Sequence, residues 1–441
     1  MTNEHRGEVD AIPPLMRTAA LGLQHVLAMY AGAVAVPLIL GAAIGLDKRH
    51  VALLVSADLF TCGIATLLQT LGFGKYIGIR LPLMMGVTMV ALAPMVQIAS
   101  SQGLQYVYGA IIVSGAVVVL SAGMFTSLLR FFPPVVTGCV ITAIGVNLLP
   151  VALNWAAGGN GAADFGAPFN LGLAAGVIVL ITVFTRFGGH FISAIALLLA
   201  MAAGSLAALL AGKMSLSGIG AEPWAAFPHP FWFGLPKFHL AAILNMLCVM
   251  LVTVMESTGV FLSMGRITGV CVGRKEVSAG LRAEGIAAII GSVLNSFPYI
   301  TFSQNLGLVA LTQVKSRYVI AFGGVILLLL GTLPKLAIVV ASIPAPVLGG
   351  AALAMFGTVA ASGIRTLSEV DYNRQGNMFI VAISLGLGIG SAMTPSLFAK
   401  CPAFVQHMAG NGLLLCAVSA IFLNWLFTGA KGEDCPSGGG D

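Results

Sequence analysis

Long apolar runs separated by short polar gaps extend over almost the whole chain. An α-helix needs about 20 predominantly apolar residues to cross a bilayer, and many windows of this sequence meet that length. We predict an all-α polytopic membrane protein with fourteen spans, two of them short or broken. The predicted spans are residues 18–42, 51–73, 79–100, 106–127, 134–153, 170–187, 191–211, 239–263, 279–296, 301–314, 317–334, 345–363, 377–394 and 409–428.

The polar gaps divide the chain into regions. No gap is long enough for a soluble domain, and because residues 1–17 are polar we expect no cleavable signal peptide. We predict five regions: a cytoplasmic N-terminus (1–17), a first repeat of seven spans (18–211), an inter-repeat loop (212–238), a second repeat of seven spans (239–428) and a cytoplasmic tail (429–441).

An internal repeat supports this division. The pattern Pro134-Val135-x-x-Gly138, followed by Gly145, recurs 212 residues later as Pro346-Val347-x-x-Gly350, followed by Gly357. Because each half holds seven spans, an odd number, the second half would enter the membrane with the opposite polarity. Inverted repeats of this kind are typical of secondary transporters.

Two predicted spans, the third and the tenth, are interrupted at corresponding positions. The tenth holds Pro298 and the polar trio Ser303, Gln304 and Asn305, and about 212–216 residues earlier the third holds Pro82. Backbone that is not helical survives at membrane depth only where it lines a cavity or is buried in protein. We predict short extended strands at both breaks and a helix that begins at Gln304. The alternative is an ordinary interfacial loop with Gln304 and Asn305 at a helix start.

Composition and charge agree with a membrane protein. The chain is 58% hydrophobic and 8% charged, and its mean hydropathy is +1.00. Of its 21 lysines and arginines, all but six would lie on the side of the N-terminus, which indicates cytoplasmic termini in the cytoplasmic (inner) membrane. The seven cysteines show no CxxC spacing, so we expect neither a disulfide framework nor a metal site. The six lysines and arginines predicted on the side opposite the N-terminus are Lys48, Arg49, Lys213, Lys237, Lys335 and Lys400.

Three acidic side chains fall inside predicted spans, where a charge costs at least about 2.5 kcal/mol. Glu256 is the most central, and it can carry a proton or accept hydrogen bonds from a ligand; a helix–helix hydrogen bond is the alternative. Glu284 lies beside Arg282 near the cytoplasmic end of its predicted span, so interfacial snorkelling competes with proton coupling. For Asp58 we expect a structural hydrogen bond. His25, in the apolar first span, either shapes a site or bonds a neighbouring helix.

Several of these residues together carry a family resemblance. The segment Gln304-Asn305-x-Gly307-x-x-x-x-Thr312, with the Gln24-His25 pair and Glu256-Ser257-Thr258-Gly259, resembles the signature of the nucleobase-ascorbate transporter family (nucleobase:cation symporter type 2). The likeness covers the chain from the first span to the twelfth and is strongest to bacterial xanthine permeases. It implies a core and a gate domain, a homodimer, and nucleobase import coupled to protons, with no other cofactor, no metal and no nucleic acid.

The resemblance also implies roles for individual residues. Glu256 and Gln304 would hold the base, Glu256 and Glu284 would couple protons, and the short third span would offer its backbone. Met89 stands where the family has a phenylalanine that stacks on the base, so Phe302 or Tyr299 would have to replace that ring. The expected substrate-binding residues are Glu256, Gln304, Met89, Thr88, Ser303, His25 and Asn305.

We therefore predict a proton-coupled importer of a purine nucleobase, xanthine first and uric acid second. Glutamine at position 304 can both donate and accept hydrogen bonds, which suits an oxopurine edge. Uracil transport is the alternative within the class, and an anion transporter of the same architecture is a further one, although neither break has a lysine or arginine at its centre. We find no nucleophile–base pair that would indicate an enzyme.

Overall fold

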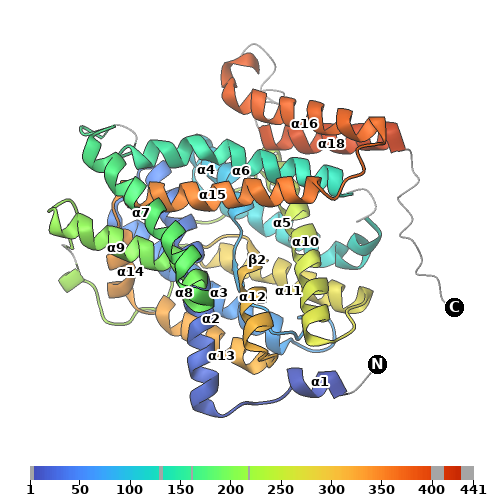
Figure 1. Ribbon diagram of the computed structural model, residues 1–441, viewed down its shortest axis with the longest axis horizontal. Helices are drawn as coiled ribbons and strands as arrows, with labels where there is room; N and C mark the ends of the chain where they lie inside the picture. Colours follow the sequence, from blue (N-terminus) through green and yellow to red (C-terminus); the bar gives the residue numbers. More distant parts are fainter. Residues whose placement is uncertain (1–3, 129–132, 160–161, 217–218, 399–411, 429–441) are drawn as a thin grey trace. The chain divides into compact units, whose positions relative to one another are not determined.

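The computed structural model describes residues 4–128, 133–159, 162–216, 219–398 and 412–428, which are mostly helical (Figure 1). The helices of the first half are α1 (Glu4–Val9), α2 (Leu15–Ala43), α3 (Lys48–Leu71), α4 (Leu92–Gln102), α5 (Leu104–Leu128), α6 (Pro134–Ala156), α7 (Pro168–Phe187), α8 (Gly189–Ala194) and α9 (Ala196–Leu210). Those of the second half are α10 (Leu240–Thr268), α11 (Arg274–Val293), α12 (Gln304–Thr312), α13 (Arg317–Gly331), α14 (Pro334–Ala341), α15 (Ala345–Leu367), α16 (Gln375–Met393) and α18 (Gly412–Thr428).

Every predicted span coincides with a helix or with a strand that runs into a helix. Within the described ranges, eight helices are long and apolar enough to cross a bilayer, or nine if the bent pair α13 and α14 forms one span. The bend between α13 and α14 is 81° and was not predicted. It follows from Pro334, which cannot continue α13 but is well suited to the first turn of a new helix.

The chain forms two compact units, and each draws on both halves of the sequence. The first comprises residues 1–122 and 150–354, and the second comprises residues 123–149 and 355–441. In the second unit α6 and α15 pack closely: a methyl group on Gly138 would lie 2.7 Å from Leu367 Cγ, and one on Gly145 would overlap Ala360. These contacts run in opposite directions along the two helices, which are therefore antiparallel. The helices carry the repeated Pro-Val-x-x-Gly pattern.

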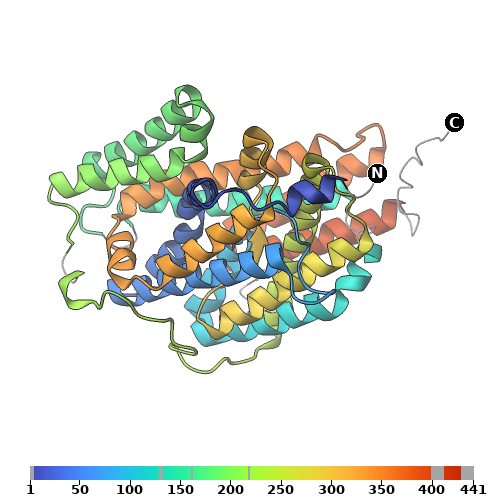
Figure 2. The same ribbon diagram turned by 90° about the horizontal axis from the view of Figure 1, so that it is seen from below.

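In the first unit, α13 packs against both α2 and α3 through neighbouring glycines. α3 and α13 lie side by side in both views (Figure 1, Figure 2). A methyl group on Gly323 would lie 3.2 Å from Gly22 O of α2, and one on Gly324 would lie 3.2 Å from Gly63 O of α3. Small residues allow membrane helices to approach this closely, because there is little hydrophobic drive between helices in lipid. Gly323 and Gly324 thus allow α13 to pack closely against both α2 and α3.

We expect Gly63→Val to destabilise this packing. A β-carbon at Gly63 would lie 2.7 Å from Gly324 O and 2.8 Å from Leu328 Cγ, so α3 and α13 would have to separate. Overpacking of this kind typically costs about 1–3 kcal/mol. The thermal unfolding of detergent-purified protein should show a lower midpoint for Gly63→Val. The same substitution at Gly172 of α7, where nothing lies within 4 Å, should leave the midpoint nearly unchanged.

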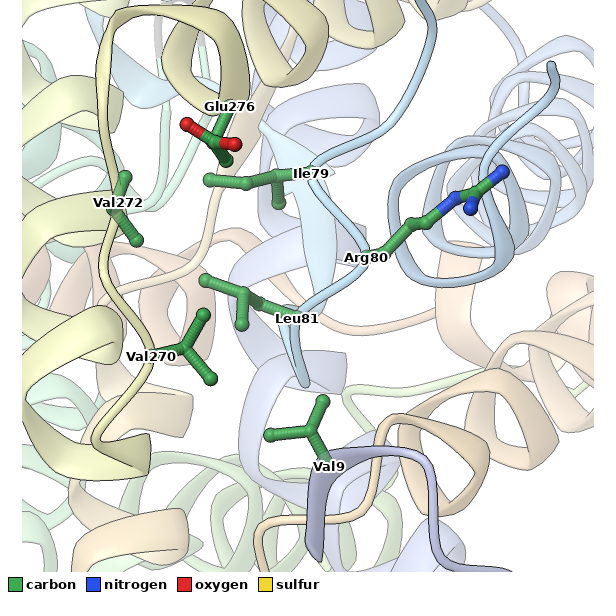
Figure 3. Close-up of a pocket in the computed structure, with 7 residues that line it drawn as sticks. All are labelled: Val9, Ile79, Arg80, Leu81, Val270, Val272 and Glu276. Carbon is green, nitrogen blue, oxygen red and sulfur yellow. The ribbon is translucent and has the colours of Figure 1, made fainter. Parts of the chain in front are cut away.

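The N-terminal segment lies on the core of the first unit instead of extending away from it. Val9 is buried, and it lines a small cleft beside the start of the third predicted span, together with Leu81 and Val270 (Figure 3). Arg80 extends away from the other labelled side chains. Two ion pairs connect the segment to the turn after α12, Lys315 Nζ to Glu8 Oε2 at 2.9 Å and Arg317 Nε to Asp10 Oδ1 at 2.6 Å. The cleft has room for about one water molecule and is no substrate site.

Candidate functional site

The two breaks predicted from the sequence meet and pair with each other. Strand β1 (Met85–Val87) and strand β2 (Tyr299–Thr301) are antiparallel, with Gly86 opposite Ile300. Two further bonds extend the ladder, from Thr88 N to Pro298 O at 2.9 Å and from Phe302 N to Met84 O at 2.8 Å. Each break therefore satisfies the backbone of the other, as buried non-helical chain requires. The alternative of an ordinary interfacial loop is wrong, because these strands are buried.

Each strand runs into a short helix. After β1 the chain forms the 3₁₀ turn η1 (Met89–Ala91) and then α4, and after β2 it forms α12, which begins at Gln304 as predicted. Two helix N-termini thus lie beside the paired strands, and the positive end of a helix dipole favours ligand oxygen atoms or negative charge. Ser303, just before α12, is exposed. The side chain of Gln304 lies outside what the structure describes.

Asn305 and His25 come together across 280 residues of sequence. Both side chains are buried. Asn305 Nδ2 lies 3.2 Å from His25 O and 3.0 Å from His25 Nδ1. A carbonyl oxygen only accepts, so Asn305 Nδ2 donates to it, and His25 Nδ1 then also faces a donor. His25 Nδ1 can accept from Asn305 Nδ2 when the imidazole hydrogen lies on Nε2. The pair connects α2 to the first turn of α12, and Asn305 Oδ1 remains buried without a partner among the described residues.

Glu256 lies on α10, which contacts η1, β2 and α12. Its side chain is partly exposed, whereas the next residue, Ser257, is fully buried. One turn further along, Gly259 is exposed, and nothing lies within 4 Å of the place where its β-carbon would be. Within the described residues, no lysine or arginine forms an ion pair with Glu256. Glu256 is therefore a partly exposed acidic residue without an ion pair among the described residues, on a helix that contacts both broken spans.

Glu284 lies deeper than the sequence indicated. It is 0% exposed, and its Oε1 accepts a hydrogen bond of 2.9 Å from Thr301 Oγ1 in β2, while Oε2 is buried without a partner in the described residues. Interfacial snorkelling beside Arg282 is thus wrong. The reason is that α11 begins at Arg274, five residues before the predicted start at 279, so Glu284 lies further inside the helix than predicted. The true start is capped by Glu276, whose Oε2 accepts from Gly273 N at 3.0 Å. Thr301, the partner of Glu284, was not among the predicted residues.

Thr88 and Met89, the two predicted site residues of the third span, differ in exposure. Thr88 is buried, and its Oγ1 accepts from Val90 N at 3.3 Å, so the hydroxyl caps η1. Met89, the first residue of η1, is partly exposed beside it. Neither proposed replacement for a stacking ring is free. Tyr299 is 0% exposed and its hydroxyl is bonded inside the protein, and the ring of Phe302 packs between Gly32 and Gly86.

Two interrupted spans whose buried strands pair with each other, next to helix N-termini and a partly exposed glutamate, are the arrangement of a secondary transporter. Comparison with known proteins agrees. Residues 16–397 match the family described as "Permease family" (Xan_ur_permease). The chain belongs to this family, the nucleobase-ascorbate transporters, and is a transporter and not an enzyme.

Related proteins match along nearly their whole length. The chain is 46% identical to the nucleobase transporter PlUacP of Paenibacillus larvae, over 95% of this chain and 96% of that protein. It is 45% identical to the uric acid transporter UacT of Escherichia coli (96% and 88% covered) and 44% identical to the xanthine permease of Bacillus subtilis (93% and 94% covered).

Solved structures share the fold at low sequence identity. The transmembrane domain of the cyanobacterial bicarbonate transporter BicA matches with a TM-score of 0.56 and 13% identity, covering 94% of this chain and 98% of that one. SLC26A9 matches with a TM-score of 0.63 and 11% identity, covering 95% and 67%. These likenesses concern the fold alone.

Proposed function

We propose that this protein imports an oxidised purine base, xanthine or uric acid, together with protons across the cytoplasmic membrane. The observation that carries the proposal is the position of Glu256, a partly exposed residue on a helix that contacts both broken spans. An oxopurine presents N–H and C=O groups along one edge. Glu256 would accept from its N–H groups, while the side chain of Gln304, at the start of α12, would bind the adjoining edge.

Proton coupling follows from the same carboxyl group. Xanthine is neutral, and uric acid is a monoanion near neutral pH. A carboxyl group that takes up a proton lets either ligand bind without leaving an uncompensated buried negative charge, which would be costly in a membrane protein. Glu284, buried against β2, is the second group that we assign to coupling. Coupling requires that proton and base together favour the conformation that faces the other side.

The proposed architecture has fourteen spans in two inverted repeats, with both termini cytoplasmic and two copies in a homodimer. The antiparallel contact of α6 with α15 and the crossing of β1 with β2 both support a two-fold relation between the halves. We assign the crossing, with His25, Glu256 and Asn305, to a core domain, and the helices of the second compact unit to a gate domain.

Relatives named for uric acid and for xanthine are about equally similar to this chain, so both bases belong in the proposal. Uracil is the competing ligand. Anion transport, which the names of the structural neighbours indicate for those proteins, is less compatible here. Residues 82–91 and 298–312 contain no lysine or arginine that would attract an inorganic anion.

Uptake of radiolabelled bases into energised cells that lack purine permeases tests the proposal. We expect xanthine or uric acid to accumulate, and a protonophore to reduce the accumulation to the background of cells without the transporter. Excess unlabelled oxopurine should compete, and excess bicarbonate or sulfate should not. Accumulation of uracil alone would contradict the proposed purine substrate. Uptake that a protonophore does not reduce would contradict the proposed coupling to protons.

A further inference from the structure

A third acidic residue, Asp58 of α3, lies in the membrane-spanning core and has no part in the function proposed above. It is 0% exposed. Its Oδ1 accepts hydrogen bonds from Ser296 Oγ at 2.9 Å and from Tyr299 OH at 3.0 Å, and Cys62 Sγ lies 3.9 Å from Oδ2. Within the described residues it forms no ion pair. A buried carboxyl group is costly unless such bonds compensate it.

The partners of Asp58 lie on the two sides of the second break. Ser296 precedes the Phe297-Pro298 pair, and Tyr299 follows it as the first residue of β2. The two hydroxyl oxygens are also 2.5 Å apart. Asp58 Oδ1, Ser296 Oγ and Tyr299 OH thus contact one another at the point where the chain leaves α11 and becomes extended. The side chain of Asp58 therefore fixes the start of β2.

The other strand is bonded to the same helix. Thr66, two turns further along α3, is 0% exposed, and its Oγ1 accepts from Met85 N at 3.1 Å. Met85 begins β1, and Val87 at the end of β1 pairs with Tyr299. α3 is therefore hydrogen-bonded to both strands, through Asp58 to β2 and through Thr66 to β1. A displacement of Tyr299 would be transmitted through this pairing to Val87, and through the bond from Thr88 N to Pro298 O to the start of η1.

We propose that Asp58 is a positioning residue for the substrate site. Through Ser296 and Tyr299 it fixes β2, and with it the register of β1 and the place where α12 begins. This inference rests on the proposed function, because those elements carry the groups that would bind the purine. Asp58 does not touch the ligand itself, since no part of its side chain is exposed. What the site requires of it is an oxygen that accepts two hydrogen bonds, and not a charge.

The experiment compares Asp58→Asn, Asp58→Leu and Tyr299→Phe with the native protein at matched amounts in the membrane. The asparagine oxygen can accept the same two bonds, so its KM should stay within about threefold of the native value. Leucine leaves two buried hydroxyl groups without their acceptor, and its KM should rise on the order of tenfold or more. Tyr299→Phe removes one of the bonds and should lie between the two.

A second readout separates positioning from mere stability. The ratio of the KM values for xanthine and uric acid should change in Asp58→Leu, because the groups that discriminate between the bases are displaced. Thr70→Val is the matched control. Thr70 is a buried residue of the same helix, but its hydroxyl bonds only within α3, to Thr66 O at 2.7 Å. This variant should keep the native ratio.

Three results would overturn the inference. If Asp58→Leu kept the native KM values and the native ratio of the two, the hydrogen bonds of Asp58 to Ser296 and Tyr299 would have no effect on the substrate site. Loss of protonophore-sensitive accumulation in Asp58→Asn, with unchanged binding, would make Asp58 a proton carrier. If the native protein carries none of the bases, the proposed function fails. Asp58 is then judged by the melting temperatures of Asp58→Leu, Tyr299→Phe and the double variant, in which additive losses contradict the link and non-additive losses support it.

Discussion

Glu256→Gln is expected to abolish accumulation of the transported base. Glutamine keeps the shape of the side chain but can neither take up a proton nor accept charge-assisted hydrogen bonds. A hydrogen bond to a charged group contributes roughly 1.5–3 kcal/mol, so kcat/KM should fall by about 10- to 100-fold, since 1.4 kcal/mol corresponds to a factor of ten. Loss of the proton site should also remove the response to a protonophore. Initial rates and steady-state accumulation in energised cells measure the two effects separately.

Glu276→Gln is the matched control for this variant. Glu276 is also partly exposed and lies at the start of α11, where it lines the small cleft beside Val9 (Figure 3). Its loss should leave KM and protonophore sensitivity close to native. If Glu256→Gln retains full protonophore-sensitive accumulation, neither the proton nor the ligand role of Glu256 can stand. If it exchanges labelled base across the membrane but no longer accumulates it, only the proton role is supported.

Gly86→Ala is expected to eliminate transport although it adds a single methyl group. The new β-carbon would overlap the ring of Phe302, with Phe302 Cδ2 only 2.5 Å away. The ring cannot retreat, because its other edge lies against Gly32, where a β-carbon would be 2.9 Å from Cε1. Either β1 separates from β2 or α2 moves. We expect a cost of about 1–3 kcal/mol in stability and loss of uptake, measured by thermal unfolding and by transport in the same membranes.

A second substitution should reverse the effect. Phe302→Val removes the δ and ε carbons of the ring, which are the atoms that meet the new methyl group, so the double variant Gly86→Ala, Phe302→Val should recover stability and a measurable part of the uptake. Gly172→Ala serves as the control for a glycine replacement, since that position is open. If Gly86→Ala is as active and as stable as the native protein, the strands are not packed as described. A double variant no better than Gly86→Ala would locate the damage elsewhere.

Much of this arrangement could be predicted from sequence because membranes restrict what a chain can do. A proline and three polar residues in an apolar run leave few options at membrane depth, so the break before Gln304, the strand and the new helix followed directly. The corresponding break near Pro82 followed from the repeat. The strands at both breaks were confirmed, whereas their pairing with each other, with Gly86 opposite Ile300, was not predicted.

What could not be predicted depends on contacts between residues far apart in the chain. Nothing in the sequence near Glu284 points to Thr301, and an error of five residues in the start of α11 was enough to place this side chain at the interface instead of the core. Phe302 and Tyr299 had the right chemistry for stacking. Their availability depended on Gly32 and on Asp58, which no local pattern connects to them.

The pairing of β1 with β2 also has a consequence for how the protein is made. Met85 and Thr301 are 216 residues apart, so at a synthesis rate of about 5–20 residues per second the first strand waits roughly 10–40 s for its partner to be translated. During that time its amide and carbonyl groups have no strand to bond with, and lipid offers none. The third span must therefore stay in contact with water or with the insertion machinery until the tenth has been made.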